Sequence, residues 1–214
     1  MNKINYQKEL ERVIADNQQL GRVPGLLLHV CCAPCSSYCL EYLSHYFDIT
    51  VYYYNPNITI PEEYAYRLRE EKRLLAQMDF ARPVRITESE YHPADFLSAV
   101  RGLEREPEGG RRCRECFRLR LEATAKKAAA EGYDYFTTTL TISPLKNAAL
   151  LNELGAEMGA KHGAAWLYSD FKKKEGYKRS IELSRAYDLY RQNYCGCIFS
   201  KAEQQAKSAD KEQS

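Results

Sequence analysis

Six of the eight cysteines in this chain stand in three closely spaced pairs, a pattern that could bind a metal or carry electrons. The pairs are the adjacent Cys31 and Cys32, the CxxC motif of Cys113 and Cys116, and the CxC motif of Cys195 and Cys197. Residues 1–6 are too polar for a secretory signal, so we expect a cytoplasmic protein whose thiols stay reduced. In that compartment such spacings favour metal or redox chemistry over structural disulfides.

The adjacent cysteines follow the apolar run 26–30, which predicts a buried strand ending at the sheet edge where α/β proteins bind ligands. Pro34 would turn the backbone there, so that both thiols could face one metal. The CxxC pair is expected at the start of a helix, one turn apart. Four thiolates from these two segments would suit either a zinc ion or an iron–sulfur cubane, and spacing does not separate the two.

The remaining cysteines near these motifs have two candidate roles each. Gly196 lets the backbone fold sharply, so that Cys195 and Cys197 could chelate a metal or close a small, easily reduced disulfide. Cys35 lies at the predicted N-terminus of a helix that begins near Ser36, where the helix dipole favours a thiolate. It could be a further metal ligand or a proton donor.

Apolar runs alternate with helix-period segments along the chain, which predicts a mostly parallel, Rossmann-like sheet. About five strands are expected, over residues 26–30, 49–54, 84–86, 135–138 and 164–168. Helices are expected near residues 5–20, 36–46, 61–78, 114–131, 145–160 and 178–192, the last of them delivering the CxC motif. We therefore predict a single α/β domain over residues 1–200 and a polar C-terminal tail, with a short helix fraying into it, over 201–214.

Charge and hydropathy limit the partners. The formal net charge is +2, with 28% charged residues and no apolar stretch long enough to span a membrane. Any nucleic-acid site must therefore be a local patch. One candidate patch is the mixture of aromatic residues and cations over residues 171–179. The other is the arginine cluster around the CxxC motif, which could attract a polyanionic substrate and would also stabilise thiolates and an anionic cluster bound to them. Its members are Arg111, Arg112, Arg114, Arg118 and Arg120.

A third candidate binding feature follows the predicted strand at residues 135–138. Ser143 is expected to cap the next helix, with Pro144 at its first position. The free backbone N–H groups of that helix start, with Lys146 close by, could bind a phosphate. An ordinary capped helix would explain the same residues.

Taken in order, six segments resemble the epoxyqueuosine reductase QueH family. They are HVCCAPCS (29–36), YNPNI (54–58), CREC (113–116), TTLTISP (138–144), DFK (170–172) and YRQNYCGC (190–197). The resemblance spans about residues 24–200. It implies a cytoplasmic bacterial enzyme that reduces the epoxide of epoxyqueuosine, at the wobble position of the tRNA anticodon, to queuosine without cobalamin.

The same resemblance implies a cofactor. A 4Fe-4S cluster would be held by Cys31, Cys32, Cys113 and Cys116. The CxC motif would be a redox-active pair or, with Cys35, part of a second metal site that holds a mononuclear iron. Some members carry aspartate where this chain has Cys35, which leaves the ligands of the second iron open.

Epoxide reduction needs two electrons, an acid for the departing oxygen and exclusion of water. A cluster carries one electron at a time, so a dithiol or an adjacent iron would be a sensible second store. Candidate acids are Asp170 and a thiol of the CxC motif, while Asn55 and Asn57, which follow a strand, could bind polar groups of the substrate. The tRNA and an unidentified electron donor are the expected partners.

Two other functions compete with this one. A nucleotide-activating tRNA-modifying enzyme would carry a glycine-rich SGGxDS-type phosphate loop after the first strand, where cysteines stand instead. A nonenzymatic RNA-binding module stabilised by zinc would explain four thiols and basic patches. It would not explain a separate CxC motif.

Overall fold

Four parallel strands form the centre of the molecule, in the order β3-β2-β1-β4. The computed structural model describes residues 4–212. The strands are β1 (Gly25–His29), β2 (Asp48–Tyr53), β3 (Arg85–Glu88) and β4 (Tyr135–Thr138). In the register of the sheet, Leu27 of β1 lies between Thr50 of β2 and Phe136 of β4. This confirms the predicted α/β class with a parallel sheet.

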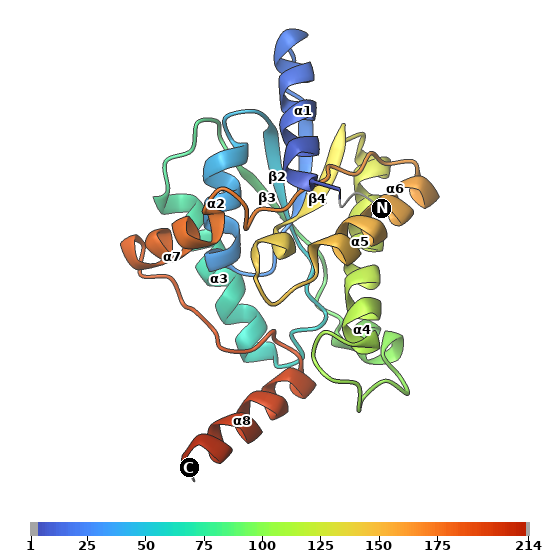
Figure 1. Ribbon diagram of the computed structural model, residues 1–214, viewed down its shortest axis with the longest axis vertical. Helices are drawn as coiled ribbons and strands as arrows, with labels where there is room; N and C mark the ends of the chain where they lie inside the picture. The colour runs from blue at the N-terminus through green and yellow to red at the C-terminus, as the bar shows by residue number, and fades with distance from the viewer. Residues whose placement is uncertain (1–3, 213–214) are drawn as a thin grey trace.

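Helices cover both faces of the sheet (Figure 1). They are α1 (Tyr6–Gln19), α2 (Ala33–Leu43), α3 (Pro61–Gln77), α4 (Pro93–Ala99), α5 (Arg111–Glu131), α6 (Ala148–His162), α7 (Gly176–Ala186) and α8 (Ile198–Glu212), with the 3₁₀ helix η1 (Thr139–Ile142) after β4. Helix α4 has no counterpart among the predicted helices. In the described part of the chain, no helix combines the length and apolarity that crossing a bilayer requires.

Side chains of β1 alternate between two apolar cores, as a buried strand requires. Leu26 and Leu28 pack with residues of α1 and α2 on one face. Leu27 packs with residues of α5 and α6 on the other face. Because both faces are buried, β1 is held firmly and the loop after it has a fixed position at the carboxyl edge of the sheet.

The segment predicted as a fifth strand, residues 164–168, forms a single parallel bridge between Trp166 and Phe136. Side chains form hydrogen bonds with backbone groups that a longer strand pairing would use. Thr137 Oγ1 donates to the carbonyl of Leu167, at 2.8 Å, and the N–H of Ser169 donates to Asn152 Oδ1, at 3.0 Å.

The predicted start of the helix after β4 is wrong. Thr138 accepts a hydrogen bond from the N–H of Leu140 and begins η1 directly after the strand. The cap of α6 is therefore Asn147, which accepts from the N–H of Leu150, and not Ser143. Ser143 and Pro144 lie in the turn between η1 and α6, so the helix start lies four residues later than predicted, directly after Lys146.

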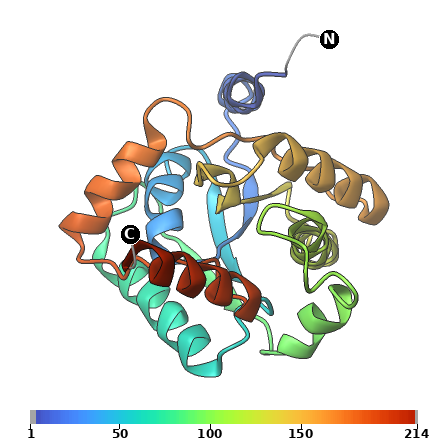
Figure 2. The ribbon, with the colours of Figure 1, turned by 60° about the horizontal axis from the view of Figure 1, so that its bottom comes forward.

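The C-terminal part also differs from the prediction. The helix expected over 178–192 ends at Ala186, and Asp188 adopts a left-handed conformation with φ of 48°. The CxC motif therefore stands at the beginning of α8 rather than at the end of a long helix. Helix α8 occupies most of the segment predicted as a tail, and residues 213–214 lie outside the described residues. Figure 2, turned toward this end of the molecule, shows α8 crossing it between α3 and the segment that leads into α5.

Candidate functional site

Three thiols meet where the chain passes from β1 into α2. The Sγ atoms of Cys31, Cys32 and Cys35 all lie within 4.8 Å of one another, with 3.7 Å between the first two. Cys32 is the N-cap of α2, and Pro34 stands in its first turn, which confirms the predicted change of backbone direction. Thiol ligands at these separations could hold one metal ion.

The three thiols do not ionise equally. Hydrogen bonds from Cys31 and Cys35, followed by the charge of Arg67, hold the pKa of Cys32 well below its usual value. The contact with Cys32 raises the pKa of Cys31, and contacts with both neighbours together with burial raise that of Cys35. Of the three thiols, Cys32 is therefore the one whose thiolate is most favoured.

The other two motifs share a pocket of about 250 Å³. Its sulfur-bearing residues are Cys113, Cys116, Cys195 and Cys197. The CxxC pair lies in the first two turns of α5, as predicted. The CxC pair is fixed by Ser200 of α8, whose Oγ accepts from the N–H of Cys195 at 2.9 Å and whose N–H lies 3.4 Å from Cys197 Sγ.

An adjoining pocket connects the two groups of thiols. Lys146 and Cys195 line both pockets, and Cys35 lines the second. The charges of Cys195, Cys31 and Cys35, in their ionised forms, raise the pKa of Lys146 against the effect of burial. Seven of the eight cysteines thus gather around one region, while Cys39 is buried in the apolar core beneath α2.

The CxC loop is held on α3 by a buried arginine. Arg67, only 1% exposed, pairs with Glu63 at 2.7 Å and donates to the carbonyl of Cys195 at 3.1 Å. Gly196 has a φ of 125°, and a Cβ there would lie 2.8 Å from Ile58 Cγ1. Glycine is required at this position for both reasons.

Some of the residues predicted to bind substrate line the two pockets, and one supports the backbone instead. Asn57 lines the pocket of the CxxC and CxC motifs, and its buried Oδ1 has no hydrogen-bond partner. Ser143 and Lys146 line the adjoining pocket. Asn55 instead donates to the carbonyl of Val30, at 2.8 Å, and so supports the backbone that leads into the adjacent cysteines.

Asp170, the predicted acid, is not among the residues that line the two thiol pockets. It pairs with Lys172 at 2.8 Å and faces a third pocket, which Lys146 also lines. Asp170 therefore approaches the site from the far side of Lys146. Its role as the acid stays a prediction.

The arginine cluster of α5 does not form the exposed face that the sequence predicts. Arg112 is buried, pairs with Glu203 of α8 at 2.6 Å and donates to the carbonyls of Glu104 and Glu106. Arg114 and Arg118 pair with carboxylates of α6, at 3.1 and 2.5 Å. The guanidinium of Arg112 holds the loop before α5 against α8, so Arg112 is not part of an exposed cationic face. It does line the pocket of the CxxC and CxC motifs, and its role in binding the substrate stays a prediction.

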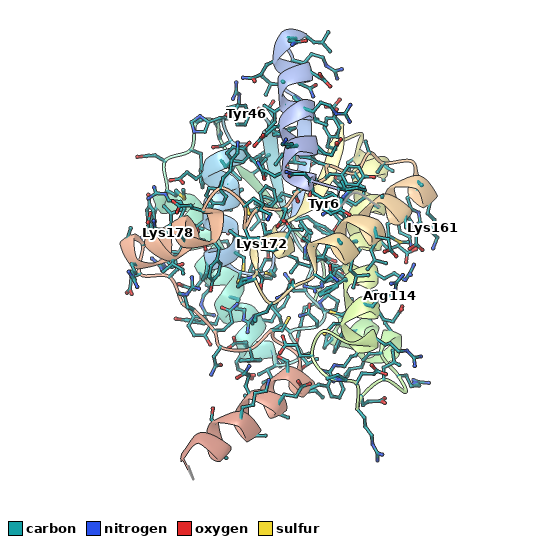
Figure 3. All side chains as sticks on the ribbon, viewed as in Figure 1. Tyr6, Tyr46, Arg114, Lys161, Lys172 and Lys178 are labelled. Carbon is teal, nitrogen blue, oxygen red and sulfur yellow. The ribbon has the colours of Figure 1, made fainter. Side chains whose placement is uncertain are left out.

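The second predicted patch, over residues 171–179, is also largely neutralised. Lys172 pairs with Asp170, Lys174 with Glu11, and Arg179 with Glu41. Figure 3 shows Lys178 and Arg114 on opposite sides of the molecule, so the two clusters do not form one surface.

Cations and aromatic rings line the second pocket, and of these only Tyr177 belongs to a predicted patch. Tyr177, Arg191 and Tyr194 line it together with Cys35 and Cys195. Lys201 of α8 places its ammonium 5.9 Å from the ring centroid of Tyr194. The sequence does contain a signal for this surface, because aromatic, cationic and amide residues alternate directly before the CxC motif.

Comparison with known proteins agrees with the geometry. The family model described as epoxyqueuosine reductase QueH matches residues 26–203. A protein named epoxyqueuosine reductase QueH from Staphylococcus epidermidis is 45% identical over 206 residues, which cover 94% of this chain and 87% of the relative. One of the same name from Streptococcus pyogenes is 44% identical over 200 residues, with coverage of 92% and 78%. One from Thermotoga maritima is 37% identical over 186 residues, with coverage of 86% and 94%.

Proposed function

This chain belongs to the epoxyqueuosine reductase QueH family, and we propose that its thiol-lined pockets reduce the epoxide of epoxyqueuosine in tRNA to queuosine, the last step of queuosine biosynthesis. The protein is thereby an oxidoreductase, proposed to act in the bacterial cytoplasm without cobalamin. The observation that carries the proposal is the gathering of three cysteine motifs, distant in sequence, around two adjoining pockets.

The reaction defines what the site must do. Conversion of the epoxide to an alkene releases the oxygen as water and consumes two electrons and two protons. Water must stay away from the ring, because it would open the epoxide by hydrolysis. Phe96, Phe117 and Leu150 provide an apolar lining for that purpose beside the CxxC and CxC thiols.

We propose that the thiols hold a 4Fe-4S cluster, with Cys31, Cys32, Cys113 and Cys116 as ligands, and that Cys35 and the CxC motif serve a second iron or a dithiol. The donor set fits such a group, since it consists of soft sulfur ligands around which Lys146 and Arg67 place positive charge. When bound, the centre would supply electrons at low potential, which an external electron donor would replace.

Residues of this chain would handle the substrate itself. The Lys146 ammonium lies between the two pockets, where it would stabilise negative charge on the departing oxygen. A thiol of the CxC motif or Asp170 would then supply the proton. The unpartnered buried amide oxygen of Asn57 would accept a hydrogen bond from the modified base.

The tRNA would enter over the second pocket. Arg191 and Lys201 would contact phosphates, while Tyr177 and Tyr194 would offer rings on which an extruded base could stack. The pockets are recessed, so the modified nucleotide must leave the anticodon stack to reach the thiols.

Anaerobic purification tests this function directly. We expect a brown protein that contains iron and acid-labile sulfide and converts epoxyqueuosine in tRNA to queuosine when a reductant is added. Cys32→Ser should lose iron and activity, and Cys39→Ala, which alters a thiol outside the pockets, should keep both. A colourless zinc protein that binds RNA without conversion would instead indicate a nonenzymatic binding module.

A further inference from the structure

Arg120 of α5 is a buried cation without an anionic partner from the protein. Its side chain is 0% exposed, and its Nε donates to the carbonyl of Cys116 at 3.3 Å. Nη1 and Nη2 have no hydrogen-bond partner. Within residues 4–212, no carboxylate pairs with this guanidinium. Four N–H donors are therefore left open in the interior of the protein.

The other two buried arginines of the described chain each pair with a carboxylate. Arg67 pairs with Glu63 at 2.7 Å, and Arg112 pairs with Glu203 at 2.6 Å. An unpaired charge inside a protein is strongly destabilising. Two of the three buried arginines thus have carboxylate partners and the third has none. We therefore expect the charge of the third arginine to be balanced from another source.

Ionised thiols are the groups whose negative charge acts on the guanidinium. The charges of Cys116, Cys195, Cys31 and Cys113, in their ionised forms, raise the pKa of Arg120 against the effect of burial. His29 also lies in this interior, where it hydrogen-bonds Thr138 Oγ1 and the carbonyl of Tyr54, and it supplies no negative charge. Lys146 adds a second cation to the same region. Within residues 4–212, Cys31 and Cys195 are thiols whose ionised forms act on both cations, and metal binding would make such thiolates permanent.

We propose that Arg120, whose Nη1 and Nη2 are free to donate, is the counter-charge of the metal–thiolate centre and raises the reduction potential of that centre. This inference rests on the proposed cofactor. A positive charge held in a region of low dielectric favours the reduced state, which carries one more negative charge. Arg120 is thus a positioning and tuning residue rather than one that contacts the substrate.

The test is a redox titration of the anaerobically purified full-length protein, followed by electron paramagnetic resonance. Arg120→Met should lower the ratio of reduced to oxidised centre at a fixed potential about tenfold, equivalent to about 59 mV for one electron. Arg120→Lys, which keeps the charge, should shift it less. Arg118→Met, which removes a half-exposed arginine paired with Glu157 on the same helix, should not shift it.

Each other outcome contradicts the inference in a recognisable way. An unchanged potential in an iron-loaded Arg120→Met protein would show that the charge does not act on the centre. Failure of both Arg120 variants to fold, while the wild-type protein folds, would make the arginine a structural residue only. Wild-type protein without iron would overturn the proposed cofactor as well as this inference.

Discussion

Ser36 Oγ of α2 lies 2.8 Å from Oε2 of Glu71 of α3, and also 3.1 Å from the carbonyl oxygen of Ala33. A hydroxyl has one hydrogen, so Ser36 donates either to Glu71 or to Ala33, and a protonated Glu71 can donate to Ser36 in the second case. The other carboxyl oxygen of Glu71, Oε1, is buried and has no hydrogen-bond partner among the described residues. Burial raises the pKa of Glu71 to about 8, which agrees with a protonated carboxyl. Because Ser36 follows Cys35, the neutral carboxyl supports the helix turn on which the three thiols meet.

Because of Glu71, we expect the free energy of unfolding to fall as pH rises. Its pKa is 4.5 in the unfolded chain and about 8 in the folded protein. Between these values the unfolded chain has lost the proton and the folded protein retains it, so the free energy of unfolding falls by about 1.4 kcal/mol per pH unit. Below 4.5 the contribution is fully present, and above about 8 no further loss follows.

Urea unfolding of wild-type protein and Glu71→Gln at several pH values checks this. The glutamine amide can still donate to Ser36 but does not titrate. The difference in unfolding free energy between the two proteins should thus grow in favour of Glu71→Gln from pH 5 to pH 8. Parallel stability curves over this range would contradict the prediction.

Gly196→Ala should displace the CxC loop. The left-handed φ and the 2.8 Å approach to Ile58 Cγ1 both oppose a side chain at this position. We expect a loss of about 1–3 kcal/mol in stability together with a large loss of reductase activity. Gly21→Ala is the matched control, because Gly21 also has a positive φ but an added Cβ meets nothing within 4 Å. It should lose some stability and keep its activity; equal activity in both variants would be the contrary result.

Local geometry near the thiols could be predicted from sequence because short-range features determine it. The apolar run before Cys31, the proline after Cys32 and the spacing of the CxxC motif each fix a turn or a helix start within a few residues. Cys35 joined the adjacent cysteines because α2 begins at Ala33, three residues earlier than expected, which places its thiol in the first turn.

Features that depend on distant contacts could not be predicted in this way. Arg112 appears in a run of cations, but its partner Glu203 lies 91 residues later on α8. The absence of a partner for Arg120 is likewise a property of the folded interior. The start of α6 could not be predicted because Thr138 and Ser143 are both suitable N-cap residues. In the structure Thr138 caps the 3₁₀ helix η1, and Asn147 rather than Ser143 caps α6.

The tRNA-binding surface should lie at Arg191 and Lys201, not on α5. Replacing both with glutamate should weaken tRNA binding and reduce the slope of log affinity against log salt by about 0.7–0.9 for each lost phosphate contact. The control is Arg85→Glu, which changes an exposed cation at the start of β3, at the opposite end of the sheet from the thiols. Binding assays over a range of salt concentrations provide the measurement. Equal slopes in the double variant and the control would exclude this surface.

The last prediction distinguishes two roles for the CxC motif. Cys195 and Cys197 lie in the pocket of the CxxC motif, while Cys35 lies with the adjacent cysteines. If the CxC pair is a dithiol, Cys195→Ser should retain all of its iron and lose multiple turnover. Wild-type protein should then show two thiols that oxidise and reduce together, and its pre-reduced form should complete one turnover without added reductant.

If the CxC pair binds a second iron, Cys195→Ser and Cys35→Ser should each lose about one iron atom while the cluster spectrum persists. Iron analysis and thiol titration of both variants therefore separate the two roles, because only the second couples Cys35 to the CxC motif. Normal multiple turnover in Cys195→Ser would contradict both. The second electron would then have to come from elsewhere in the site, and Cys35 and Asp170 would be the next residues to replace.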